Sequence, residues 1–104
     1  MIRSTNISLK GCQIIEAITK VANKHKLDID EVDFYSAKDW KDRGEPYGTN
    51  SNLVMTFDGG WMYDVANFTS IYWDDVLTDV IDALGELGVY FECGHSWNAG
   101  VYDI

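Results

Sequence analysis

One amphipathic pattern constrains the fold of this chain more than any other feature. Residues 70–88 have the sequence SIYWDDVLTDVIDALGELG, in which apolar side chains recur at the three- and four-residue spacing of one helix face. Thr69 or Ser70 can cap such a helix, and Gly88 can end it. The expected inward stripe consists of Trp73, Val76, Leu77, Val80, Ile81, Leu84 and Leu87. We therefore expect a long helix that buries one face in the core.

A second amphipathic helix is expected near the N-terminus, over residues 8–25. Its apolar stripe consists of Ile14, Ile15, Ile18, Val21 and Ala22. The segment before it, residues 2–9, is expected to form a short strand. Residues 32–34 alternate as a strand would, and residues 36–44 favour a helical turn that brings Ala37 and Trp40 together.

Two hairpins are expected from alternating runs rich in β-branched and aromatic residues. The first joins residues 52–57 to residues 61–68 through Asp58-Gly59-Gly60, and the second joins residues 89–93 to 99–104 through residues 94–98. A chain of 104 residues suits one compact domain. The fold expected for residues 1–104 is therefore a single α+β domain, with two main helices packed on one face of an antiparallel sheet built from hairpins.

Charge is distributed very unevenly along the chain. All eight Lys and Arg residues lie within the first 43 positions, whereas ten of the seventeen acids lie after them. The two parts carry 8 − 7 = +1 and −10, which sum to the net charge of −9. Direct binding to nucleic acid is disfavoured, because phosphate contacts need clustered basic residues. A basic surface on a protein that itself binds nucleic acid is the partner we expect; the alternative is that the acids serve only solubility.

The acids of the 70–88 helix form a regular row. Asp75, Asp79, Asp82 and Glu86 are spaced by four, three and four residues, so they share one exposed face, with Asp74 beside them. Carboxylates one turn apart are separated by roughly 5 to 6 Å, close to the roughly 6 to 7 Å between phosphates of an extended nucleic-acid strand. No lysine stands four residues further along, and the last acids lie at the unfavourable C-terminal end. We predict that this face, together with Asp64 and Trp97, binds the partner; a merely solvated acidic face and cation binding are the alternatives.

The segment Cys93-Gly94-His95 suggests chemistry at first sight. The alternative function is a small enzyme or ligand-binding domain that uses Cys93 and His95, but no oxyanion donor is evident nearby. Structural zinc needs four ligands, and the other two candidates, Cys12 and His25, lie about 140° apart around one helix. The Asp28–Asp33 segment departs from a calcium loop at its fifth and sixth positions. We therefore expect no catalytic residue, metal or cofactor.

The location expected from the sequence is the cytoplasm. The N-terminal residues lack the apolar run of a secretory signal, and no segment approaches the roughly 18 consecutive apolar residues of a membrane span. Two cysteines 81 positions apart do not make a disulfide framework. No membrane partner is expected.

In size, charge and aromatic content the chain resembles small acidic inhibitors, such as phage anti-restriction and anti-CRISPR proteins and the immunity proteins that block nucleases. The resemblance implies a phage-encoded or operon-encoded protein that acts in a host cytoplasm, and it assigns no residue. The leading hypothesis is a non-enzymatic inhibitor that mimics phosphates on the basic surface of a nuclease or effector complex. A third hypothesis is an oligomerisation module, in which Lys20, Lys24 and Lys26 meet the acidic half of a neighbouring copy in a homodimer.

Overall fold

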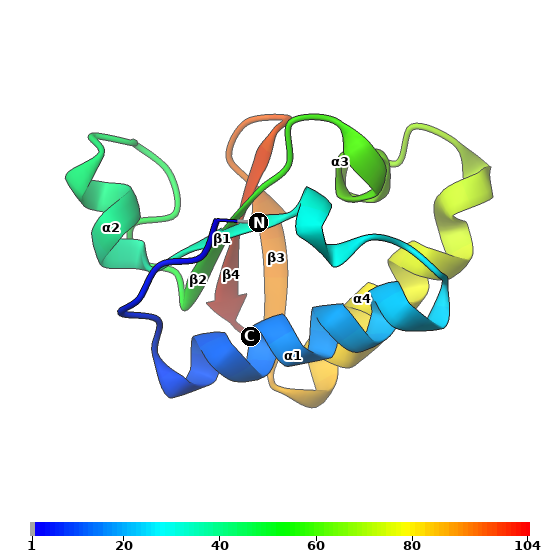
Figure 1. Ribbon diagram of the computed structural model, residues 1–104, viewed down its shortest axis with the longest axis horizontal. Coiled ribbons are helices and arrows are strands. Elements are labelled where there is room, and N and C mark those ends of the chain that lie inside the picture. Colours follow the sequence, from blue (N-terminus) through cyan, green and yellow to red (C-terminus); the bar gives the residue numbers. More distant parts are fainter. Residues whose placement is uncertain (1) are drawn as a thin grey trace.

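A computed structural model describes residues 2–104 and shows an α+β architecture (Figure 1). The sheet has four antiparallel strands in the order β1-β2-β4-β3. The strands are β1 Asp33–Tyr35, β2 Leu53–Thr56, β3 Val89–Cys93 and β4 Asn98–Asp103. The helices are α1 Leu9–Lys24, α2 Ala37–Asp42, α3 Gly60–Asn67 and α4 Asp74–Glu86, with short 3-10 turns at Ile29–Glu31 and Ile71–Trp73.

Helices α1 and α4 pack against each other and against the strands, and this confirms the predicted fold class. Most of their buried residues belong to the predicted stripes: Ile14, Ile15, Ile18, Val21 and Ala22 of α1, and Val76, Val80 and Leu84 of α4. Gly11 of α1 is also buried, and the predicted Trp73, Leu77 and Leu87 are partly buried. Ser8 caps α1 by accepting a hydrogen bond from Gly11 N. The predicted cap Ser70 accepts from Tyr72 N and begins the 3-10 turn before α4, whereas α4 itself starts after Trp73 without a side-chain cap. Ile81 departs from the prediction, because its side chain is 52% exposed.

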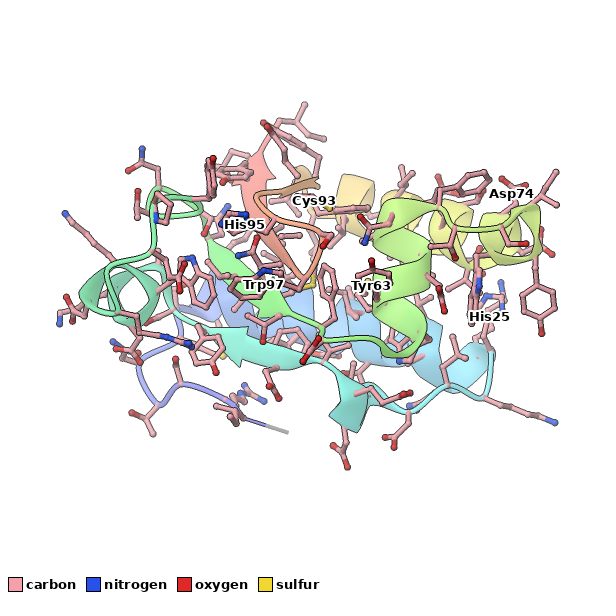
Figure 2. All side chains as sticks on the ribbon, turned by 90° about the horizontal axis from the view of Figure 1, so that it is seen from above. His25, Tyr63, Asp74, Cys93, His95 and Trp97 are labelled. Atoms are coloured by element: carbon pink, nitrogen blue, oxygen red, sulfur yellow. The ribbon has the colours of Figure 1, made fainter. Side chains whose placement is uncertain are left out.

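The opposite face of the sheet is covered by α2 and the loop that follows it (Figure 2). Strand alternation turns Leu53 and Met55 of β2 toward the main core, and Val54 between them toward Trp40 and Gly48. Trp40 is fully buried there. The predicted helical turn around Ala37 and Trp40 is therefore confirmed, and it encloses a second, smaller apolar region.

The first predicted hairpin is wrong in its second half, because residues 61–68 do not form a strand. They belong to α3, which buries Trp61, Met62 and Val65. Their spacing of one and four residues is that of a helix face, although Trp61 and Val65 also fit a strand alternation. No place for a further strand exists beside β2, since β1 pairs with one of its edges and β4 with the other. Strands β3 and β4 form a hairpin, whereas β1 and β2 pair across a long connection that contains α2.

The predicted N-terminal strand is reduced to a single parallel bridge between Arg3 and Phe34. The bridge lies on the outer edge of β1, where Phe34 N donates to Ile2 O at 2.9 Å and Ser4 N donates to Phe34 O at 3.0 Å. The segment that follows Asp28 forms the first 3-10 turn and leads into β1. Asp28 caps the first 3-10 turn by accepting from Asp30 N. Among residues 2–104, no helix is both long and apolar enough to cross a bilayer.

Candidate protein interface on helix α4

The acidic face of α4 lies beside α1, which runs antiparallel to it. Lys10 in the first turn of α1 donates to the carbonyl of Leu87 just after α4, while His25 at the end of α1 reaches Asp79. The lysine places a cation at the negative end of the α4 dipole. Local sequence spacing could not predict this contact, because Lys10 and Leu87 are 77 positions apart. The end of α4 thus has a basic neighbour that local spacing did not reveal.

Asp79 differs from the other acids of the face because it is paired within the chain. Its Oδ2 lies 2.9 Å from Lys24 Nζ and 2.6 Å from His25 Nε2, and its side chain is half-buried. The hydrogen bond with Lys24 and then that with His25 hold the pKa of the Asp79 carboxyl below its usual value. Asp79 therefore has its ion-pair partners within the chain, so it is not one of the free acids that a basic partner would meet.

The remaining acids of α4 are exposed and unpaired. Among residues 2–104 no ion pair or side-chain hydrogen bond engages Asp74, Asp75, Asp82 or Glu86. Asp82 and Glu86 border an open groove of about 520 Å³ between α1 and α4. The charged residues along the groove are Glu16, Lys20, Lys24, Asp79, Asp82 and Glu86. Because Lys20 pairs with Glu16 at 3.3 Å and Lys24 with Asp79, the free charge of the groove is negative.

The two other predicted partner-binding residues lie away from this face. Asp64 is half-buried on α3, where its Oδ1 accepts a hydrogen bond from the Thr69 hydroxyl at 2.8 Å. Trp97 lies in the connection between β3 and β4, and Figure 2 shows it far from Asp74 at the start of α4. The predicted set is therefore not one site, and only the α4 carboxylates are gathered on one surface.

Trp97 instead belongs to a chain of aromatic contacts that the sequence analysis missed. Its ring stacks on His95 with centroids 5.5 Å apart and an interplanar angle of 10°, and it tilts against Trp40 at 5.9 Å. His95 also meets the ring of Tyr47 edge-on at 5.0 Å. Strand periodicity could not reveal these contacts, because Tyr47 and His95 come from two separate loops. These aromatic side chains therefore pack against one another, and they are not all available as free surface for a partner.

Within residues 2–104 no hydrogen bond joins the side chains of Cys93 and His95, as it would join a nucleophile to its base. The Sγ of Cys93 lies 3.8 Å from the carbonyl of Ala66, and burial, with a smaller effect of Glu92, raises the pKa of this thiol. A raised pKa reduces the thiolate fraction that nucleophilic chemistry needs. His95 is held by its aromatic neighbours and by its backbone N–H, which donates to Asn98 Oδ1 at 2.7 Å. Across the part of the chain that the structure describes, no three His, Cys, Asp or Glu side chains gather as a metal site would need.

Comparison with known proteins leaves the function to be argued from this geometry. No protein-family model, curated protein or solved structure matches the chain.

Proposed function

We propose that this protein is a small acidic, non-enzymatic inhibitor whose α4 face occupies a basic, nucleic-acid-binding surface on a larger protein. The observation that supports the proposal is the set of four exposed carboxylates on α4 that have no ion-pair partner within residues 2–104: Asp74, Asp75, Asp82 and Glu86. Packing within the chain could have supplied ion-pair partners for these acids, as Lys24 and His25 do for Asp79. A basic partner would supply the missing pairs.

The shape and charge of the face suit such a partner. Asp82 and Glu86 stand one helical turn apart, and Asp75 lies two turns before Asp82, so the carboxylate spacing on this helix is fixed before binding. A net charge of −9 would steer the protein toward a positive surface and raise the association rate. The carboxylates would then occupy positions that phosphates take in the partner's own complex. The inhibitor would compete with nucleic acid for the same surface.

The decisive experiment uses purified nucleases and CRISPR effector complexes, with cleavage of a DNA duplex as the readout. We expect the protein to inhibit at least one member of such a panel at low salt, and excess DNA to relieve the inhibition. The variant D74N/D75N/D82N/E86Q should inhibit at least roughly fourfold less, because four rim ion pairs of roughly 0.2 to 1 kcal/mol each are lost. Asp79 is left intact so that its pairing with α1 is preserved.

A matched control separates the α4 face from total charge. The variant D30N/E31Q/E45Q/D58N removes four carboxylates that lie off α4 and make no ion pair within residues 2–104. Both variants have a net charge of −9 + 4 = −5. The proposal requires the control to keep its inhibition. Equal loss in both variants would show that only overall charge matters, and no loss in the α4 variant would remove this face from the interface.

A further inference from the structure

One edge of the sheet is covered by another segment of the chain, and the other edge is open. The outer edge of β1 is covered by residues 2–4, which bond to both the N–H and the C=O of Phe34. Strand β3 forms the other edge and pairs only with β4. No segment within residues 2–104 covers the second edge of β3. Such an open edge is a template for pairing with another strand.

The register of the β3–β4 hairpin shows which backbone groups are free. Gly94 N donates to Asn98 O at 3.2 Å and Ile104 N donates to Gly88 O at 2.9 Å, so the even-numbered residues of this strand bond to β4. The N–H and C=O groups of Val89, Phe91 and Cys93 therefore point to the open edge. No hydrogen bond found within residues 2–104 satisfies them. Backbone groups of this kind are satisfied by water or by another strand.

An apolar groove of about 320 Å³ runs along this edge, between β3 and α4. It is lined by Ile81, Leu84, Gly85, Tyr90, Phe91 and Ile104, together with Val89. Three of these side chains are well exposed: Ile81 at 52%, Tyr90 at 44% and Ile104 at 82%. The exposed side chain of Ile81, which the helix pattern placed in the core, is therefore part of a continuous apolar surface.

Gly85 leaves one wall of the groove without a side chain. Glycine is among the poorest helix formers, and Gly85 lies within the last turn of α4. Contacts within the chain do not require it, because a Cβ at this position would meet nothing within 4 Å. The missing side chain leaves space beside the free edge of β3, where a further backbone can approach.

We propose that a second copy of this chain docks on β3, antiparallel to it, and continues the sheet across a two-fold axis at Phe91. This register pairs Phe91 with Phe91 of the other copy and Val89 with Cys93, so it uses the three residues whose backbone groups are free. It also sets Glu92 of one copy opposite Tyr90 of the other, whose hydroxyl can donate to the carboxylate. A two-fold axis at Glu92 would instead bring two carboxylates together.

Three features favour a second copy over an unrelated strand. The groove is apolar, and a two-fold axis brings the exposed Ile81 and Ile104 of each copy toward the same interface. Glu92 is the only charged residue of β3, which has no lysine or proline to prevent pairing with the same strand of another copy. The covered edge of β1 stops further addition, so the pairing closes at two copies. The proposal does not rest on the inhibitor function.

Sedimentation of the full chain over a concentration series tests the pairing. In about 0.5 M NaCl, where repulsion between the two acidic copies is screened, we expect a monomer–dimer equilibrium. The variant Gly85→Gln should weaken the dimer at least about tenfold while improving the helix, because its side chain fills the space beside β3. Asn23→Gln is the control, since it places a glutamine at an exposed position of α1 outside the groove. A wild-type chain that stays monomeric throughout, or a Gly85→Gln variant that dimerises like the wild type, would overturn the proposal.

Disulfide trapping tests the register independently of affinity. Residues opposite each other in a non-hydrogen-bonded pair have Cα atoms about 4.5 Å apart, within the roughly 4.4 to 6.8 Å that a disulfide spans. In a Cys12→Ser/Cys93→Ser background, a mixture of Tyr90→Cys and Glu92→Cys chains should form a disulfide-linked dimer in a redox buffer. Each variant alone should not. Linkage by Glu92→Cys alone would refute the axis at Phe91, and absence of linkage in the mixture would refute the interface.

Discussion

At the scale of single residues, Asp79 joins the two long helices through an ion pair that depends on pH. The pKa of its carboxyl is lowered in the folded chain, first by Lys24 and then by His25. The stabilisation is therefore complete above the unfolded pKa of about 3.9 and is lost as pH falls through the lower folded value. We predict that Asp79→Asn lowers the urea midpoint above about pH 5, and that its difference from the wild type shrinks below about pH 4.

The control for this prediction is Asp82→Asn, which removes an exposed and unpaired carboxylate from the same face of α4. Urea titrations of the three proteins at a series of pH values give the comparison. Wild-type and Asp79→Asn curves that stay parallel down to the acid end would contradict the role of Asp79.

Cys93 tests the enzymatic alternative at the same scale. Because burial and Glu92 raise the pKa of its thiol, the thiolate is scarcer at a given pH than in an exposed cysteine. We predict that Cys93, as the sole cysteine of a Cys12→Ser variant, reacts with iodoacetamide more slowly in the folded chain than in the same chain unfolded in urea. Mass spectrometry over time at pH 8 measures both rates. A faster reaction in the folded chain would indicate an activated thiol and would support the hypothesis that Cys93 is a nucleophile.

At the scale of elements, periodicity predicted the two long helices and the last hairpin. Helices α1 and α4 and the β3–β4 hairpin follow directly from stripes and alternation. The eight residues of α3 were predicted as a strand, because Trp61 and Val65 suit both periods in so short a segment. The order of the strands was beyond local patterns, since β4 lies between β2 and β3 only through pairings of residues far apart in sequence.

The candidate interface was predictable only where it depends on local sequence spacing. The row of acids on α4 is a local spacing and was found from sequence. The pairing of Asp79 with His25 joins residues 54 positions apart, so only the packing of α1 on α4 reveals it. The exposure of Ile81 likewise follows from where α4 meets the edge of the sheet. Local spacing thus identified the charged surface, whereas the fold decides which of its charges remain free.

At the scale of the whole molecule, two separate surfaces should respond to salt in opposite directions. The α4 carboxylates would attract a basic partner, so added salt should weaken that complex by screening the attraction. Two copies that meet at β3 each carry a net charge of −9 and repel each other, so added salt should strengthen the dimer. Measuring inhibition and sedimentation of the same preparation between about 0.05 and 0.5 M NaCl compares the two trends.

The variant D74N/D75N/D82N/E86Q sharpens this comparison, because it reduces the net charge to −9 + 4 = −5 without changing β3. We predict that it binds a basic partner more weakly than the wild type at low salt and dimerises more strongly there, since both changes follow from the same lost charge. The difference between the two proteins should fade at high salt as the remaining charges are screened. If inhibition and dimerisation instead weakened together, the two processes would share one surface, and the separation between the α4 face and the β3 edge would be wrong.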